Sequence, residues 1–151
     1  MVLGRVNPYT EDTHFSLTAH VCFADFAGFL GFFIRIQQDA TAYVFRLDLT
    51  EATDQVAIQS LGAGTVVLGT MALFGESEGL FNTVKIVIDV ANLEYVSVTI
   101  NGVAFDLAGD TPLEEGGAGI ESIETFLLWS GSDDNAQSLY VDNLSIAHND
   151  T

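Results

Sequence analysis

Apolar and polar residues alternate with a period of two along most of the chain. In "HFSLTAHVCF", residues 14–23, the odd positions are apolar and most of the even positions are polar. Such alternation is typical of a strand with one buried face. Two further strands are predicted within the hairpin of residues 31–49, and others at 55–61, 65–73, 83–90, 95–100, 103–107, 123–129 and 138–147. About ten short strands with turn signals between them predict an all-β fold, an antiparallel two-sheet sandwich.

The stretch "GFFIRIQQDATAYVFRLDL" predicts a hairpin within residues 31–49. A two-residue turn at Ala40-Thr41 would align the apolar faces of both strands, which is how register is fixed. The same register would set Arg35 opposite Arg46 and Phe33 opposite Asp48. Two of the four basic residues of the chain are therefore expected on one face, beside a carboxylate.

Two further connections are predicted between residues 90 and 117. Asn101-Gly102 suits a type I′ hairpin turn. The turn before this hairpin must have an odd number of residues if Val96 is to share the buried face with Val98, so we expect a bulged three-residue loop at residues 92–94. "DTPLEEGG", residues 110–117, has the capping pattern of one helical turn.

"FNTVKIVIDVANLEYVSVTINGVAF" and "LYVDNLSIA" resemble the central strands and the closing strand of the concanavalin A-like lectin/glucanase superfamily, including its laminin G-like members. The stretch from "FSLTAHVCFAD" to "FRLDL" is similar to the opening strands. The resemblance implies a jelly roll of two curved sheets, with ligands on the concave face or at edge loops. In many such modules an acidic residue of the last strand helps to hold a structural calcium ion. Asp142 occupies that position here.

Asp142 also raises a question from the residues alone. It shares its alternation with Tyr140, Leu144 and Ile146, the apolar positions of "SLYVDNLSI". A bare buried carboxylate is costly unless it is paired or bound to a metal. Three explanations are open: a bulge turns it outward, a hydrogen-bonded network satisfies it, or it ligates calcium, which takes six to eight oxygen ligands.

The composition and charge of the chain disfavour some classes of partner. The chain has 151 residues, consistent with a single domain over residues 1–151. It carries 21 acidic against 4 basic residues, a formal charge of −17. Nucleic acid is an unfavourable partner, because no basic cluster exists to neutralise its phosphates. No apolar run is long enough for membrane insertion, and no signal peptide is visible.

The residue patterns of familiar active sites are incomplete. In "IESIETF" Glu121 and Glu124 have an odd separation, so a strand would place them on opposite faces, whereas retaining glycosidases need two carboxylates about 5 Å apart. No Gly-x-Ser-x-Gly motif occurs. His20 and Cys22 share a strand face, with His14 further along it, but no Cys-x-x-Cys or His-x-x-x-His motif supports a zinc site. We therefore expect a non-catalytic protein, with glycosidase activity a distant alternative.

The candidate ligand-binding residues are Arg35, Arg46 and Asp48. Like charges placed opposite each other destabilise a sheet unless something neutralises them. The simpler interpretation is a structural ion network. The functional one is a site for a carboxylate, a sugar hydroxyl array or an acidic side chain, since a guanidinium fork suits planar acceptors.

Aromatic residues suggest further surfaces. Residues 23–33, "FADFAGFLGFF", hold five Phe, and the Gly28 and Gly31 breaks favour a loop in part of the segment. Such an apolar segment suits core packing or a protein partner or second subunit. Trp129 and Tyr95 are candidate platforms for sugar stacking, although a lone Trp in a strand rich in Leu is more often a core residue.

Two functional hypotheses follow. The first is a structural protein of a virion surface, such as a capsid decoration, cement or tail component, which would need no leader. The second is a lectin-like carbohydrate-binding module with a structural calcium ion. Both place the protein on a virion or at an extracellular surface.

Overall fold

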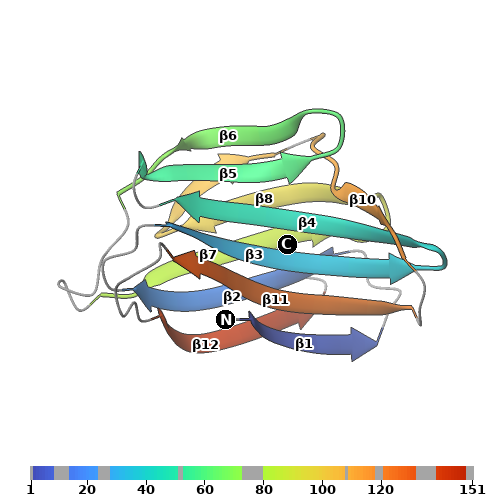
Figure 1. Cartoon of the computed structure of the whole chain (residues 1–151), viewed down its shortest axis with the longest axis horizontal. Helices are drawn as coiled ribbons and strands as arrows, with labels where there is room; N and C mark the ends of the chain where they lie inside the picture. Colours follow the sequence, from blue (N-terminus) through green and yellow to red (C-terminus); the bar gives the residue numbers. More distant parts are fainter. Residues whose placement is uncertain are drawn as a thin grey trace.

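The computed structural model describes residues 2–8, 14–23, 28–50, 53–72, 80–107, 109–117, 121–131 and 139–148. They form two antiparallel sheets that pack face to face (Figure 1), which confirms the predicted sandwich. In the described part of the chain, no helix is long and apolar enough to cross a membrane.

The larger sheet has the strand order β1-β11-β3-β4-β5-β6, with β10 paired to β4 beside that path. Its strands are β1 (Val2–Pro8), β3 (Gly28–Gln38), β4 (Thr41–Thr50), β5 (Gln55–Ser60), β6 (Gly64–Thr70), β10 (Leu113–Gly116) and β11 (Ser122–Gly131). The smaller sheet has the order β12-β2-β7-β8-β9. Its strands are β2 (His14–Phe23), β7 (Asn82–Asp89), β8 (Glu94–Ile100), β9 (Val103–Asp106) and β12 (Leu139–His148).

The core lies between the sheets and is built from the alternating positions that the sequence indicates. On β2 the side chains of Phe15, Leu17, Ala19 and Val21 are all buried. The larger sheet contributes mainly the even positions of β3, the odd positions of β4, and the apolar positions of β5 and β11. Because successive strand residues point to opposite faces, the remaining residues of β3 and β4 form the outer face of the larger sheet.

The β8–β9 hairpin has the predicted turn, with Asn101 at φ 50° and Gly102 at φ 82°. Ile100 pairs with Val103, as expected. The side chain of Asn101 accepts a hydrogen bond from the backbone nitrogen of Thr83 and donates one to Asn82. The turn therefore also fixes the start of β7.

The β7–β8 connection corrects a prediction. Residues 90–93 form the turn between Asp89 and Glu94, and a bulge falls between the pairs Val87–Ser97 and Ile88–Tyr95. The bulge, rather than an odd loop, restores the alignment of apolar faces. In consequence Tyr95 is buried, and Val96, which was expected inside, is 37% exposed.

Residues 110–117 also differ from the prediction, because residues 113–116 form strand β10 and no helical turn. Leu113 pairs with Val44 and Gly116 with Thr41. Since β5 pairs with β4 only from Arg46 onward, the first half of β4 has a free edge, and β10 occupies it. Strand β1 was not foreseen.

Candidate ligand-binding face

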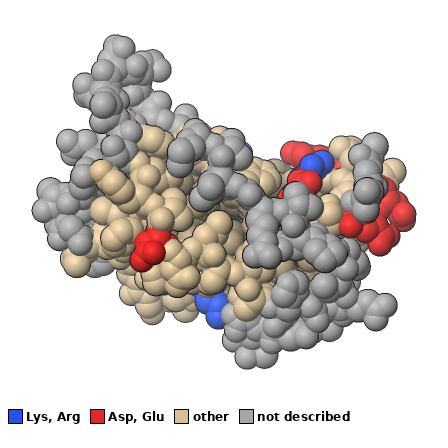
Figure 2. All heavy atoms as spheres, turned by 90° about the horizontal axis from the view of Figure 1, so that it is seen from below, with Lys and Arg blue, Asp and Glu red and all other residues tan. Residues whose placement is uncertain are grey.

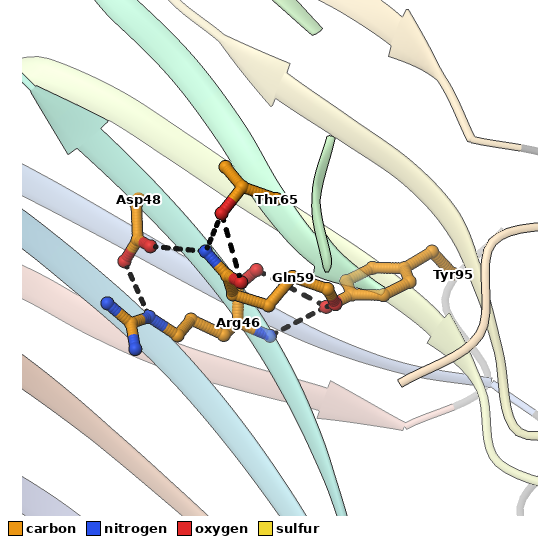
Figure 3. Close-up of polar contacts among 5 residues, drawn as sticks. All are labelled: Arg46, Asp48, Gln59, Thr65 and Tyr95. Atoms are coloured by element: carbon orange, nitrogen blue, oxygen red, sulfur yellow. Dashed lines mark hydrogen bonds and ion pairs between the residues drawn. The ribbon is translucent and has the colours of Figure 1, made fainter. Parts of the chain in front are cut away.

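An ion pair lies on the outer face of β4. The Nε of Arg46 donates to Oδ1 of Asp48 at 2.8 Å, and the other oxygen of Asp48 accepts from Nε2 of Gln59 at 3.2 Å (Figure 3). Gln59 in turn shares hydrogen bonds with the hydroxyl of Thr65 on β6. Asp48 is only 8% exposed, so these two donors provide the partners that a buried carboxylate needs.

Aromatic rings hold the guanidinium group of Arg46. Its central carbon lies 5.3 Å from the ring centroid of Phe29 and 5.2 Å from that of Phe33. Phe33 stacks on Phe126 with centroids 4.6 Å apart. Cation–π contacts of this kind restrain a guanidinium plane. Only Nε among the guanidinium nitrogens bonds to a described residue, and the Arg46 side chain keeps 30% of its area exposed.

Arg35 has a different neighbour from the one predicted. The hairpin turns at Asp39-Ala40, so Arg35 pairs with Val44 and Arg46 with Phe33. Asp39 takes a positive φ of 49°, which Asp tolerates better than most residues. The amide of Gln37 donates to the carbonyls of Asp39 and Thr41 and closes the turn there. The predicted register was wrong by two residues.

A two-residue error preserves the faces, so Arg35 and Arg46 do share the outer face but lie diagonally. Arg35 is opposite Glu124 of β11 and forms an ion pair with it at 3.3 Å. Both side chains are about one-third exposed, and exposed pairs of this kind stabilise a fold by about 0–1 kcal/mol. Each arginine therefore has its own carboxylate, and the expected clash of like charges is absent.

One row of side chains crosses the outer face at right angles to the strands. Its members are directly paired across five neighbouring strands and are, in order, Phe126, Phe33, Arg46, Gln59 and Thr65. Neighbouring strands lie about 4.8 Å apart, so the row is about 19 Å long. We call it the outer-face row. Rings occupy one end, and hydrogen-bonding groups occupy the other.

Tyr95 supports the row from beneath. It reaches across the core from β8, and its hydroxyl accepts from the backbone nitrogen of Arg46 at 2.7 Å and lies 2.9 Å from the carbonyl oxygen of Gln59 (Figure 3). Burial raises the pKa of this phenol well above its usual range, and the nearby Asp48 and Asp110 carboxylates raise it further. The neutral hydroxyl is thus a fixed link between the two sheets.

Asp142 lies on β12 opposite His20, and its side chain is exposed. The register of β12 and β2 shifts between Asp142 and Ser145, and Asn143 has a φ of 50°. The bulge, one of the three explanations, is therefore present. Among the described residues no three His, Cys, Asp or Glu side chains gather in a possible metal site. Calcium binding by Asp142 stays a prediction.

The other aromatic candidates are mostly structural. Tyr95 is buried, and Trp129 packs against the core, so Tyr95 has no surface for stacking on a sugar. Within residues 23–33, residues 24–27 lie outside the described part of the chain. Strand β3 continues through Gly31, contrary to the expected break, and places Phe32 in the core and Phe33 on the outer face.

In the view of Figure 2, most of the acidic side chains lie toward one end of the molecule, a separate acidic group lies on the other half of the face, and much of the surface is uncharged. Asp39 lies in the β3–β4 turn. Glu115 of β10 pairs with Ala42, close to the same turn. The acidic segments 75–79 and 132–136 lie outside the described residues. The outer-face row itself contains one charged side chain, Arg46, among aromatic, amide and hydroxyl groups.

No family model matches the sequence, and no curated protein matches it significantly. Solved structures do share its architecture. Galectin LEC-6 of Caenorhabditis elegans superposes with a TM-score of 0.52 and 14% identity, over 95% of this chain and 90% of the galectin. A tetrameric galectin of the sponge Cinachyrella sp. gives 0.53 and 7%, over 98% and 99%. A family 7 alginate lyase gives 0.55 and 13%, over 94% of this chain and 63% of the lyase.

This chain has the concanavalin A-like jelly-roll fold. The superfamily resemblance of the sequence is confirmed at the level of the fold. At such low identities the likeness shows the fold alone, so the residues of the jelly roll must carry any statement on function.

Sequence reasoning missed three members of the outer-face row in this jelly roll, namely Phe126, Gln59 and Thr65. Phe126 alternates with Thr125 and Leu127, which are buried, so its outward direction was readable from the sequence. Its position beside Phe33 was not, because β11 and β3 are far apart in the chain. Gln59 and Thr65 needed the register of β4 with β5 and β6, which no local turn sets.

Proposed function

We propose that this protein is a lectin-like carbohydrate-binding protein that acts without catalysis. Its glycan would lie on the outer face of the larger sheet, along the outer-face row. The comparisons support a carbohydrate ligand, because the structural neighbours include galectins, which are lectins, and an alginate lyase bound to its substrate. They favour this function over the alternative of a virion structural component, for which they give no support.

The observation that carries the proposal is the composition of the outer-face row. A sugar has an apolar face of C–H groups and an edge of hydroxyl groups. The partly exposed ring of Phe126, stacked on the buried ring of Phe33, offers an apolar surface. Arg46 offers guanidinium donors beside the Asp48 carboxylate, which Arg46 and Gln59 hold in place. Ligand sites commonly combine aromatic surface with a few fixed polar groups in this way. The cation–π contacts hold Arg46 in place before the ligand arrives, which reduces the cost of ordering it.

The charges on this face favour a neutral glycan. Arg46 is paired with Asp48, and Arg35 is paired with Glu124, so neither arginine adds net positive charge to the face. The chain as a whole carries −17 and repels polyanions at long range. Hydroxyl groups, in contrast, can accept hydrogen bonds from the Arg46 guanidinium nitrogens that bond to no described residue, without meeting that repulsion.

A glycan array followed by calorimetry with the best neutral glycan tests the proposal. We expect Arg46→Ala to weaken binding by about tenfold or more, the usual effect of losing a central contact. Arg46→Lys should recover little, because a lysine lacks the planar fork. Lys85→Ala, on β7 of the smaller sheet, removes one positive charge elsewhere and should bind as the wild type does.

Two results would count against this function. One is the absence of selective glycan binding under any condition tested, including added calcium. The other is binding that Arg46→Ala and Lys85→Ala reduce equally, which would indicate a general charge effect. The array should carry uronate and sulfated glycans as well, and preferential binding to those would contradict the neutral ligand.

Calcium and location are separate proposals. If Asp142 helps to hold calcium, Asp142→Ala and a chelator should each lower the melting temperature, and combining the two should lower it no further. A melting temperature that neither change alters would exclude this ion. An extracellular or virion-surface location agrees with a lectin and awaits localisation of the protein in its source.

A further inference from the structure

Five of the described strands have a single neighbour in their sheet, namely β1, β6, β9, β10 and β12. Four of them carry features that discourage pairing with another chain; β10, for example, is four residues long and contains Glu114 and Glu115. Edge strands expose unpaired backbone groups, and proteins commonly protect them with charges, proline, bulges or short length. Strand β1 contains Arg5 and Pro8, β9 is four residues long and contains Asp106, and β12 contains Asp142 at a bulge.

Strand β6 is the exception. It lies at the upper edge of the larger sheet (Figure 1), and among the described strands it pairs with β5 alone. Its sequence, GTVVLGT, contains no charge and no proline. It belongs to the longest stretch of the chain without Asp, Glu, Lys or Arg, residues 55–75. Its one protective feature is a bulge, where β5 steps from Val56 to Ala57 and β6 from Gly69 to Val67, so residues 64–67 keep a regular ladder.

Two of the exposed side chains of this region are large and apolar. Val67 is 51% exposed, and Leu61, in the turn before β6, is 49% exposed. A net charge of −17 makes two copies of the chain repel each other over most of their surfaces. An uncharged edge is where two such copies meet with the least repulsion, and it also offers the backbone groups for a shared ladder.

We propose that a second copy of this chain pairs antiparallel with the first along β6. The contact is isologous, because the same strand serves both copies across a two-fold axis. In an antiparallel pair this axis is perpendicular to the sheet, so the outer faces of the two copies point to the same side. The two larger sheets become one continuous sheet across the dimer.

The dimer has a consequence that rests on the proposed function. Thr65, at the end of the outer-face row, lies on β6, so the two rows approach each other across the new interface. A glycan surface would then be bound by two sites facing one way, and binding would gain from the high effective concentration of the second site. The dimer itself does not depend on any ligand.

Sedimentation velocity of the full chain over a wide range of protein concentration tests the pairing. One chain has a mass of 16.2 kDa, and we expect a reversible shift to twice that mass as the concentration rises. Raising the salt concentration should strengthen association, since the Debye length falls from about 10 Å at 0.1 M to about 3 Å at 1 M.

Three variants locate the interface. Val67→Glu places like charges in the paired edges and should weaken dimerisation by about tenfold or more. Val103→Glu is the matched control: it adds the same charge at a valine of 50% exposure on β9 and should dimerise as the wild type does. Val67→Thr keeps a β-branched, uncharged side chain and should dimerise. Circular dichroism should show that all three fold.

A monomer at every concentration and salt would overturn the proposal, as would a dimer that Val67→Glu and Val103→Glu weaken equally. The outcome is independent of the lectin function, because mass reports the pairing without a glycan. Loss of glycan binding in Arg46→Ala with an intact dimer would separate the two.

Discussion

The hydroxyl of Tyr95 lies 2.7 Å from the backbone nitrogen of Arg46 and accepts its hydrogen bond. Tyr95 belongs to the smaller sheet and Arg46 to the larger. Strand β4 changes its neighbour at this point, from β10 at residues 41–44 to β5 from Arg46 onward. The hydroxyl serves backbone groups at this change of partner, so a single side chain of one sheet completes the ladder of the other.

Replacing Tyr95 by Phe should therefore destabilise the protein. The ring would still fill the core, but the amide of Arg46 and the carbonyl of Gln59 would lose their hydroxyl partner. A buried polar group without a partner costs about 1–3 kcal/mol. We expect Tyr95→Phe to lower the free energy of unfolding by about 2–3 kcal/mol in urea denaturation.

Tyr140→Phe is the matched control for this substitution, because Tyr140 is 49% exposed. Removing the Tyr140 hydroxyl should change the free energy of unfolding by less than about 0.5 kcal/mol. Equal effects of the two substitutions would show that the bridging hydroxyl adds nothing beyond an ordinary surface phenol.

The same hydroxyl predicts a loss of stability in alkali. Burial raises the pKa of Tyr95 in the folded state, and Asp48 and Asp110 raise it further. The unfolded chain loses this proton near pH 10, which is the ordinary value for tyrosine. Above about pH 10 the unfolded state therefore binds fewer protons, and stability falls by up to about 1.4 kcal/mol per pH unit from this group. Below that pH its contribution is fully present.

Urea denaturation at several pH values on both sides of pH 10 would measure this loss. The wild type should lose stability with pH more steeply than Tyr95→Phe, which has no proton to release at this position. Parallel pH profiles of the two proteins would mean that the phenol titrates alike in the folded and unfolded states, against the prediction.

The sequence predicted what local patterns determine. The alternation on β2 identified its buried residues, and Asn101-Gly102 predicted both a turn and a register. The candidate face was predicted for the same reason, since the alternation of buried and outward positions along β3 and β4 is enough to place Arg35, Arg46 and Asp48 on one face. An error of two residues in the β3–β4 register left that alternation intact.

The failures have a common physical cause, which is that bulges and long-range pairing are not encoded locally. The bulge between β7 and β8 exchanges the faces of Tyr95 and Val96, so simple alternation points Tyr95, the residue that links the sheets, away from the core. Strand β10 formed because a free edge of β4 was present, although its own residues have a helix-capping pattern. In both cases a tertiary partner outweighed the local preference.

Gly31 supplies a last prediction, which connects packing to the candidate face. It pairs with Asp48 on β4, and the ring of Phe33 lies over it. A Cβ atom at this position would be 2.6 Å from Cε2 of Phe33 and 3.3 Å from Oδ1 of Asp48. The ring has little freedom to move, since it is 6% exposed and stacks on Phe126.

We expect Gly31→Ala to lower the free energy of unfolding by about 1–3 kcal/mol, the usual cost of overpacking. It should also weaken glycan binding, because displacing Phe33 disturbs the guanidinium group of Arg46. Gly116→Ala on β10, where a Cβ would meet nothing within 4 Å, should leave both properties unchanged. If urea denaturation and calorimetry found Gly31→Ala as stable and as active as Gly116→Ala, the close packing of Phe33 on Gly31 would not be what positions Arg46.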